Sequence, residues 1–416
     1  MRATMAFSFN DRVHYCENVV EVALRDGCFE INRSTNSIKA IRSYVEGCFS
    51  VASSTDEDYE VLKSKLLKAP KHLCRGETWF NETLSSGEFS VGEEVYEDDL
   101  KALTEVTYEM LVERGVKGEV IASHRRVRVE HFVEEYNVTA IERRAITELY
   151  IYPYTLMYGA LASTGLLTAT LRVRSIYDEL TNIIDSLVNN LRHQLIAKRL
   201  NPMYSGHWKI ILSGEASPAV FHELAHLLQG DEPVKLKIGM NLGEKVNMIE
   251  DPFHPGPLQR VFDDELYPAW RRTLIEDGRI VDYLHTRMTV FNEAKPGNAR
   301  GLFTRSKPLH HQLIVKKGDW SIDEMIDVAK RALIVRSIAR AEVSRDYIRL
   351  IPEAAVVSER DKLTPTKALE ILIPLGRLDA VFIGLGKDRN ARYTYEKQQP
   401  LYEVAPTILV EARVIT

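Results

Sequence analysis

The sequence is poor in cysteine. Its 416 residues include four, Cys16, Cys28, Cys48 and Cys74, and all lie in the first fifth of the chain. No two of them form a C-x-x-C pair, so the pattern excludes a zinc knuckle and the dense disulfide scaffold of a small secreted domain. We interpret these few cysteines as buried free thiols of a reducing compartment.

Long hydrophobic runs are also scarce. Residues 1–11 lack the extended apolar core of a signal peptide. The stretch 149–171 contains no charged residue, but it includes Pro153, Gly159 and Gly165, with tyrosines at alternate positions. This pattern is typical of strands near a turn and not of a membrane helix. We therefore expect a soluble, cytoplasmic protein without membrane contacts.

An excess of positive charge is missing as well. The formal net charge is −5, and the hydrophobic and charged shares of 45% and 27% are those of an ordinary globular protein. Proteins that bind nucleic acid usually carry a positive face, so nucleic acid is not expected as a partner. The basic tract 124–129 alternates with apolar residues, which predicts a strand with one solvated face.

The pattern along the chain predicts an α+β protein of two domains. Short strand candidates fill residues 19–53, helical spacing follows at 56–68 and 98–114, and alternation returns from 118 to 173. A helix at 175–198 ends before Asn201-Pro202. We place a mixed or antiparallel-sheet N-terminal domain at 1–198 and a β-rich C-terminal domain at 199–416.

The second half opens with a buried strand, 208–212, and a helix that carries His222, Glu223 and His226. Ser217 is the expected N-cap, Pro218 the first helical residue, and Gly230 the residue after the helix. His222 and His226 are four residues apart, so they lie on one helix face and can bind one metal ion.

Glu223 completes an H-E-x-x-H motif. In such a site the carboxylate takes a proton from the water that attacks the substrate and later gives one to the leaving amine, and the metal is most often zinc. Chance is the alternative, because roughly one chain in forty of this composition, with its twelve histidines, would carry the motif. The position on a well-capped helix after a buried strand favours a functional site.

The third metal ligand is not evident from the motif. The extended pattern H-E-x-x-H-x-x-G-x-x-H fails, because Gln229 and Glu232 stand where glycine and histidine are needed. A glutamate about two dozen residues downstream is another possibility that zinc peptidases use, and Glu244 and Glu250 both qualify. Nothing local distinguishes them.

Three segments resemble the TldD/PmbA family of cytosolic metallopeptidases, in particular its TldD-type catalytic subunit. Residues 208–231 are similar to the family's strand, turn and metal helix ending in Gly-Asp. Residues 261–265 (VFDDE) resemble its Asp-Asp-Glu segment, and residues 274–284 (LIEDGRIVDYL) resemble its hairpin. The order and spacing of the three agree with the family.

The chain departs from the family pattern at two points. The family motif is usually H-E-x-x-x-H, so His222 and His226 are one residue closer here. The family's third ligand is a cysteine near the C-terminus, and this chain has none after Cys74. The corresponding region is about 392–396, and we expect Glu396 to replace the thiolate with an oxygen ligand.

Two adjacent histidines, His310 and His311, fall where the family has a segment near the active-site cleft. Either could bind substrate or the metal. The alternative is a solvent-facing pair in a loop after Pro308. His285, in the strand after the hairpin, is expected to be structural.

The resemblance implies a zinc-dependent peptidase with one Zn²⁺ per chain that hydrolyses unfolded or short peptides in an enclosed cavity. It also implies a homodimer, or a heterodimer with a PmbA/TldE-like paralogue. The missing cysteine leaves open a non-catalytic partner subunit that has lost full metal coordination. A metal-dependent hydrolase of other bonds is a third reading, since the same helix can activate water for them.

Overall fold

Paired β-strands account for most of the architecture. The computed structural model describes residues 8–45, 48–68, 83–157, 160–231, 236–243, 246–291, 293–360, 362–367 and 370–416. The protein is a mixed, sheet-rich structure with 22% helix and 50% strand. The predicted α+β class is confirmed.

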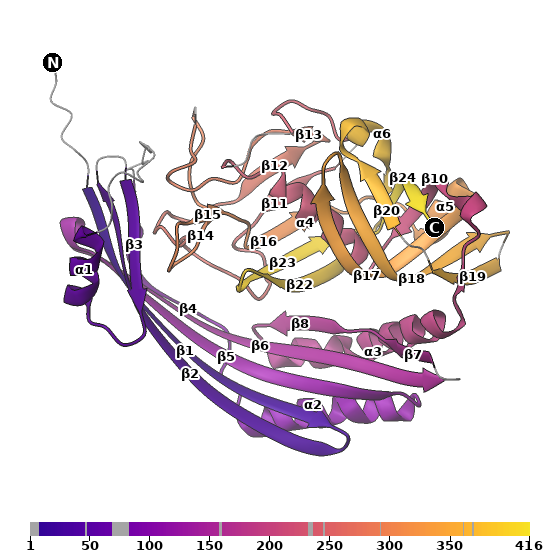
Figure 1. Ribbon diagram of the computed structural model, residues 1–416, viewed down its shortest axis with the longest axis horizontal. Coiled ribbons are helices and arrows are strands. Elements are labelled where there is room, and N and C mark those ends of the chain that lie inside the picture. The colour runs from indigo at the N-terminus through magenta and orange to yellow at the C-terminus, as the bar shows by residue number, and fades with distance from the viewer. Residues whose placement is uncertain are drawn as a thin grey trace.

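Within the described residues, the first half of the chain forms one eight-stranded sheet, the N-terminal sheet. Its order is β3-β2-β1-β5-β6-β4, and β7 and β8 pair with β6. The strands are β1 (Ser8–Arg25), β2 (Cys28–Val45), β3 (Cys48–Ser54), β4 (Gly87–Val91), β5 (Lys117–Val133), β6 (Val138–Met157), β7 (Ala160–Ser163) and β8 (Leu166–Thr170). The long strands curve together beneath the C-terminal half (Figure 1).

The N-terminal strands are longer than the sequence predicted. Two separate strands expected at 28–32 and 38–44 are one continuous strand, β2, because the polar residues between them keep their pairing with β1. Their side chains are mostly exposed, so this part of the ribbon needs no apolar pattern. The basic tract 124–129 lies in β5 and alternates between buried and exposed positions as expected.

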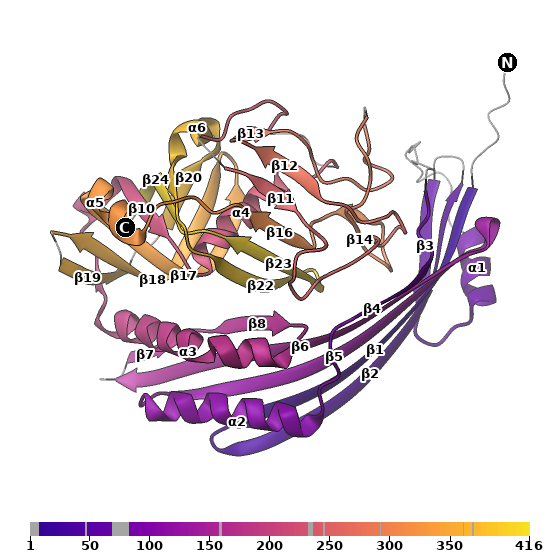
Figure 2. The same cartoon turned by 180° about the vertical axis from the view of Figure 1, so that it is seen from behind.

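Helices pack against the N-terminal sheet. They are α1 (Tyr59–Leu67), α2 (Glu97–Glu113) and α3 (Val173–Ile196), each within three residues of its predicted bounds. Helix α3 also contacts β18 (Tyr347–Glu359) and β19 (Lys362–Lys367) of the C-terminal half. Buried residues of α2 and α3 form one core with Val22, Val120 and Leu149 of the sheet. Figure 2 shows α2 on the outer side of the curved strands.

The second half contains a closed β-barrel. The strands run in the order β17-β10-β24-β20-β18, and a further pairing of β17 with β18 closes the ring. With their neighbours they are β9 (Lys198–Arg199), β10 (Gly206–Leu212), β17 (Arg331–Ser344), β18 (Tyr347–Glu359), β19 (Lys362–Lys367), β20 (Glu370–Pro374), β21 (Phe382–Leu385) and β24 (Ile408–Ile415). Closure leaves these five strands without a free edge at the seam.

A six-stranded sheet lies beside the barrel, in the order β13-β12-β11-β16-β23-β22. The strands here are β11 (Met248–Glu250), β12 (Arg272–Glu276), β13 (Arg279–Ile280), β14 (Ala299–Arg300), β15 (Lys307–Pro308), β16 (Gln312–Val315), β22 (Asn390–Glu396) and β23 (Gln399–Ala405), of which β14 and β15 form a separate hairpin. Helix α4 (Ala216–His226) packs between barrel and sheet in their shared core.

The remaining helices are short. They are α5 (Ile322–Ala329), α6 (Leu378–Val381) and the 3₁₀ turns Glu134–Tyr136, Pro202–Tyr204 and Leu375–Arg377. The side chain of Ser321 caps α5, and Glu324 completes its capping box. None of the helices in the described ranges is long and apolar enough to cross a membrane.

The cysteine interpretation is only partly right. Cys16 and Cys28 are free thiols, but Cys28 is exposed and Cys16 is half-buried. Cys48 takes part in a disulfide. The expectation of buried free thiols is therefore wrong for these three, because β1 and β2 form a thin ribbon with one open face at Cys28.

Polar contacts connect the two halves at β22. The hydroxyl of Tyr393 donates a hydrogen bond of 2.7 Å to Oε1 of Glu148 on β6, and Tyr395 donates to the same oxygen. Arg125 of β5 lies over the ring of Tyr395 and pairs with Glu148 at 3.5 Å. The N-terminal sheet thus holds the strand that ends in Glu396.

A prediction concerns the end of α4. A Cβ at Gly230 would lie 2.4 Å from Nδ1 of the buried His285, whereas a Cβ at Gly376 would meet nothing within 4 Å. We expect Gly230→Ala to lower the free energy of unfolding by about 1–3 kcal/mol through overpacking, and Gly376→Ala to leave it nearly unchanged. Urea denaturation of both variants measures this, and equal midpoints would contradict the packing described here.

Candidate metal centre

Helix α4 begins two residues earlier than its sequence suggests. It starts at Ala216 after the turn Ser213-Gly214-Glu215, and Ser217 is inside the helix, where its hydroxyl donates to the carbonyl of Pro406. The prediction of Ser217 as N-cap is therefore wrong, because a partner on a distant loop takes its side chain. Pro218 still falls in the first turn, where a missing N–H costs nothing.

The other end of the helix also differs from expectation. The helix ends at His226, and Gly230 is not in the left-handed region. A glycine is required there because the backbone passes close to His285, and the N–H of Gly230 donates to the carbonyl of Leu284 at 2.9 Å. This close approach fixes residues 227–230 against the segment that contains Leu284 and His285.

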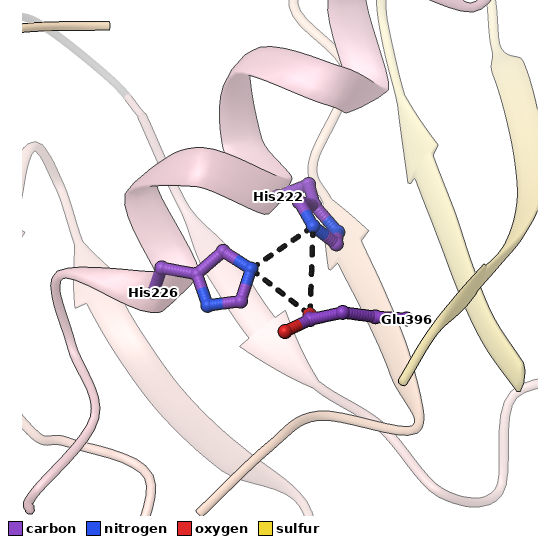
Figure 3. A group of neighbouring side chains, drawn as sticks. All are labelled: His222, His226 and Glu396. Atoms are coloured by element: carbon purple, nitrogen blue, oxygen red, sulfur yellow. Dashed lines mark hydrogen bonds and ion pairs between the residues drawn. The ribbon is translucent and has the colours of Figure 1, made fainter. Parts of the chain in front are cut away.

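Three side chains converge at the end of α4 (Figure 3). Nε2 of His222 lies 3.0 Å from Nε2 of His226, and Oε2 of Glu396 lies 3.1 Å from the latter and 3.9 Å from the former. Glu396 is the last residue of β22, so strand and helix meet at their ends. The structure thus brings together His222, His226 and Glu396, the three residues that the sequence suggested as ligands.

The spacing of these atoms matches a metal site. The nearest point equidistant from the three donor atoms lies in their plane, about 2.0 Å from each, which is the length of a Zn–N or Zn–O bond. Oε2 of Glu396 is buried and has no hydrogen-bond donor in the described part of the chain. A buried oxygen without a donor, facing two imidazole nitrogens, fits a cation, and the donor set of two nitrogens and one oxygen suits zinc.

The charges at the site favour an ionised carboxylate. Burial would raise the pKa of Glu396, but contact with His226 and the electrostatic influence of both histidines lower it to about 2. Burial likewise opposes the charged form of His226, and the nearby carboxylates of Glu396 and Glu223 outweigh it, so the pKa of His226 is raised. The same attraction is available to a divalent cation.

A second layer orients His222. Oε1 of Glu403, on β23, accepts a hydrogen bond of 2.8 Å from Nδ1 of His222, and this leaves the lone pair of Nε2 facing Glu396. The same carboxylate accepts from Nε2 of His310 at 3.1 Å and from Arg392 at 3.3 Å. One possible ligand atom from each of His222, His310 and Glu403 also lies within 4.8 Å of the other two. The hydrogen bonds already account for Glu403, however.

Sequence reasoning missed Glu403. Its only signal is an acidic residue between Leu401 and Ala405, two apolar residues on the same face of a strand, and all three are buried. Gln229 is a comparable case for His226, since its amide lies 3.1 Å from Nδ1. The amide nitrogen of Gln229 is the atom at this distance, so it can donate a hydrogen bond to Nδ1.

Both histidines expected in a loop are buried. His310 is fully buried, and burial lowers its pKa to about 4 despite the neighbouring Glu403. His311 is equally buried and points elsewhere, with Nε2 2.6 Å from Arg260 and Nδ1 3.3 Å from Glu250. The solvent-facing alternative is therefore wrong, because each ring has a buried charged partner. A role in substrate binding stays a prediction for both.

Of the two alternative third ligands, Glu250 is not at this site. Glu250 lies on β11 and interacts with the backbone and side chain of His311, and burial raises its pKa to about 7. Glu244 lies outside the described residues. Glu223 is buried beside the histidines on α4, with 7% of its surface exposed. His285 is buried, as expected of a structural residue.

A cavity of about 700 Å³ opens beside the three converging residues. His226 and Glu396 form part of its wall, and Leu227, Leu309 and Val343 form an apolar side. His226 and Glu396 are therefore accessible to a ligand from this cavity.

Comparison with known sequences gives a family. Residues 205–411 match the PmbA/TldA metallopeptidase C-terminal domain. A metalloprotease of Methanocaldococcus jannaschii is 28% identical over 248 residues, which cover 54% of this chain and 52% of that protein. A metalloprotease of Methanothermobacter thermautotrophicus is 29% identical over 157 residues, 35% of this chain and 34% of that one. The chain thus spans about half the length, or less, of these curated relatives.

Solved structures share the fold over nearly the whole chain. A candidate modulator of DNA gyrase from Thermotoga maritima has a TM-score of 0.75 at 15% identity and covers 98% of this chain and 96% of that one. One from Bacteroides thetaiotaomicron has 0.76 at 13%, covering 98% and 94%. TldE from Thermococcus kodakarensis has 0.73 at 15%, covering 98% and 97%. Together with the sequence match, this shows that the chain is a member of the TldD/PmbA family.

Proposed function

We propose that the protein is a zinc-dependent peptidase that hydrolyses unfolded or short peptides. The observation that carries this proposal is the convergence of His222, His226 and Glu396 on a point about 2.0 Å from each donor atom, next to Glu223 and at the wall of a cavity. Three protein donors with an open side are the usual set of a catalytic zinc site. The relatives named metalloproteases support the same class.

The roles of the residues follow from their positions. His222, His226 and Glu396 would hold one zinc ion per chain, which when bound polarises a peptide carbonyl and lowers the pKa of water. Glu223 adjoins His222 on the same helix, so its carboxylate can take the proton of the attacking water and transfer it to the leaving amine. Glu403 keeps the Nδ1 proton of His222 in place.

We further propose that the protein works as a dimer in the cytoplasm, with a second copy or with a PmbA/TldE-like paralogue. The likeness to the TldE structure supports a related subunit as partner, at the level of the fold. The alternative, a partner subunit without turnover, loses its main motivation if Glu396 replaces the missing cysteine. Metal content separates the two readings.

The first prediction of this proposal concerns Glu223→Ala. Because Glu223 is not among the three converging donors, we expect about one zinc per chain in both wild type and variant, by elemental analysis. Hydrolysis of an unfolded peptide should fall roughly 10²- to 10⁴-fold in the variant, since the proton-transfer group is removed. A wild type that takes up no zinc, alone or mixed with a paralogous subunit, would instead support the non-catalytic reading.

The second prediction concerns the third ligand. We expect Glu396→Ala to weaken zinc binding by roughly a hundredfold or more, measured by competition with a chelating dye, and Glu396→Cys to restore it. Cobalt-loaded Glu396→Cys should show a sulfur-to-cobalt charge-transfer band that the wild type lacks. Glu411→Ala, at an exposed position on β24, is the matched control. Unchanged zinc affinity in Glu396→Ala would remove Glu396 from the ligand set.

The third prediction concerns the second layer. Glu403→Gln keeps the size of the side chain but removes the charge that orients His222, so zinc affinity should fall about 10- to 100-fold. Glu411→Gln serves as the control for loss of one acidic group. Circular dichroism verifies that the variant is folded at the temperature of the titration. Equal zinc affinities of the two variants would show that the orientation of His222 does not depend on Glu403.

A further inference from the structure

The wall of the cavity beside the metal group is strongly basic. Arg300, Arg305, Lys307 and Lys397 contribute to it, and among the described residues that line it Glu396 is the one acid. The chain as a whole has a net charge of −5. Four cations around one cavity in an acidic protein form a local positive potential that draws anionic groups.

The cations come from two hairpins. Arg300 and Lys307 are opposite one another in the pairing of β14 with β15, and Arg305 lies in the loop between these strands. Like charges directly opposite in a ladder destabilise it. Arg300 has structural partners, because its guanidinium donates to Gln399 and to the carbonyl of Pro400. Lys307 makes no ion pair within the described ranges and is exposed, so folding does not require its charge.

Lys397 lies in the turn between β22 and β23, directly after Glu396. Lys397 and Gln398 have φ of 47° and 69°, the left-handed values that such a two-residue turn demands and that favour glycine or asparagine. The side chain of Lys397 is 76% exposed, and its Nζ lies 3.7 Å from Oε1 of Glu396. A lysine in this strained position carries its charge at the entrance to the metal group.

We infer that this basic wall, chiefly Lys307 and Lys397, binds a carboxylate of the peptide substrate. Leu227, Leu309 and Val343 supply an apolar surface in the same cavity for a neighbouring side chain. The carboxylate can belong to an Asp or Glu side chain or to the C-terminus of the peptide. The description of the ligand as a substrate depends on the proposed function, whereas its binding does not.

The experiment measures peptide binding without turnover. Two fluorescein-labelled, unstructured peptides that differ only by Glu or Gln at the same positions, each with a free and with an amidated C-terminus, are titrated with zinc-loaded Glu223→Ala protein. Fluorescence anisotropy gives Kd. We expect the acidic peptide to bind on the order of tenfold more tightly, and this advantage to shrink as salt is raised.

Variants of the full chain assign the effect to the cavity. Lys307→Gln combined with Lys397→Gln should bring the Kd of the acidic peptide to that of its Gln counterpart. Lys362→Gln, an exposed lysine on β19 with no ion pair in the described part of the chain, should change nothing. All three positions are exposed, so folding is unaffected, and melting temperatures verify this.

The outcomes are distinct. Loss of affinity on changing Glu to Gln identifies a side-chain carboxylate, and loss on amidation identifies the C-terminus; both support the inference. Equal binding of all peptides, absence of binding, or unchanged affinity in the double variant overturns it. A wild type that binds acidic peptides but cleaves none defeats the proposed function alone, and cleavage without charge preference defeats this inference alone.

Discussion

The candidate metal centre depends on the hydrogen bonds that the buried carboxylate of Glu403 accepts. An ionised carboxyl removed from water costs several kcal/mol unless its oxygens are satisfied. Here burial works against ionisation, but the hydrogen bonds from His222 and His310 and the charge of Arg392 hold the pKa of Glu403 well below its usual range. These partners lie on α4, before β16 and on β22, so one charge fixes three separate elements.

The N-terminal half, which carries no motif, has a physical part in the site. Its sheet reaches β22 through Glu148, which accepts hydrogen bonds from Tyr393 and Tyr395. Glu396 ends the same strand, one residue beyond Tyr395. The position of the third donor is therefore set from two sides: by β23 within its own sheet, and by a different sheet below. A C-terminal half alone would lack the second support.

The sequence predicted the helices and the spacing of the histidines, but not the barrel or the start of α4. The periodicity of α2 and α3 and the histidine spacing on α4 are local properties, and local patterns predicted them well. The barrel was not foreseen, because it depends on the pairing of β10 with β17 and β24, which are distant from it in the sequence. Residue Ser217 has the chemistry of an N-cap and was misassigned, since only the folded chain brings Pro406 to it.

The surroundings of the site could not be predicted from local sequence patterns either, because they also depend on residues that are distant in the sequence. Resemblance directed attention to Glu396, but its approach to His222 and His226 results from the hairpin of β22 and β23. His310 looked like a loop residue because a polar residue next to proline usually is one. Its burial follows from a partner 93 residues away, and no pattern within the segment encodes that partner.

The converging trio contains no sulfur, and this has a consequence for the conditions under which the site can persist. A thiolate donor can be oxidised through sulfenic acid or captured in a mixed disulfide, and either event would release a metal. Two imidazoles and a carboxylate have no such chemistry. The set is also harder in character, so it is less selective against manganese, iron or cobalt than a site with a thiolate. Peroxide stress would thus spare this centre, and the available metal would matter more to it.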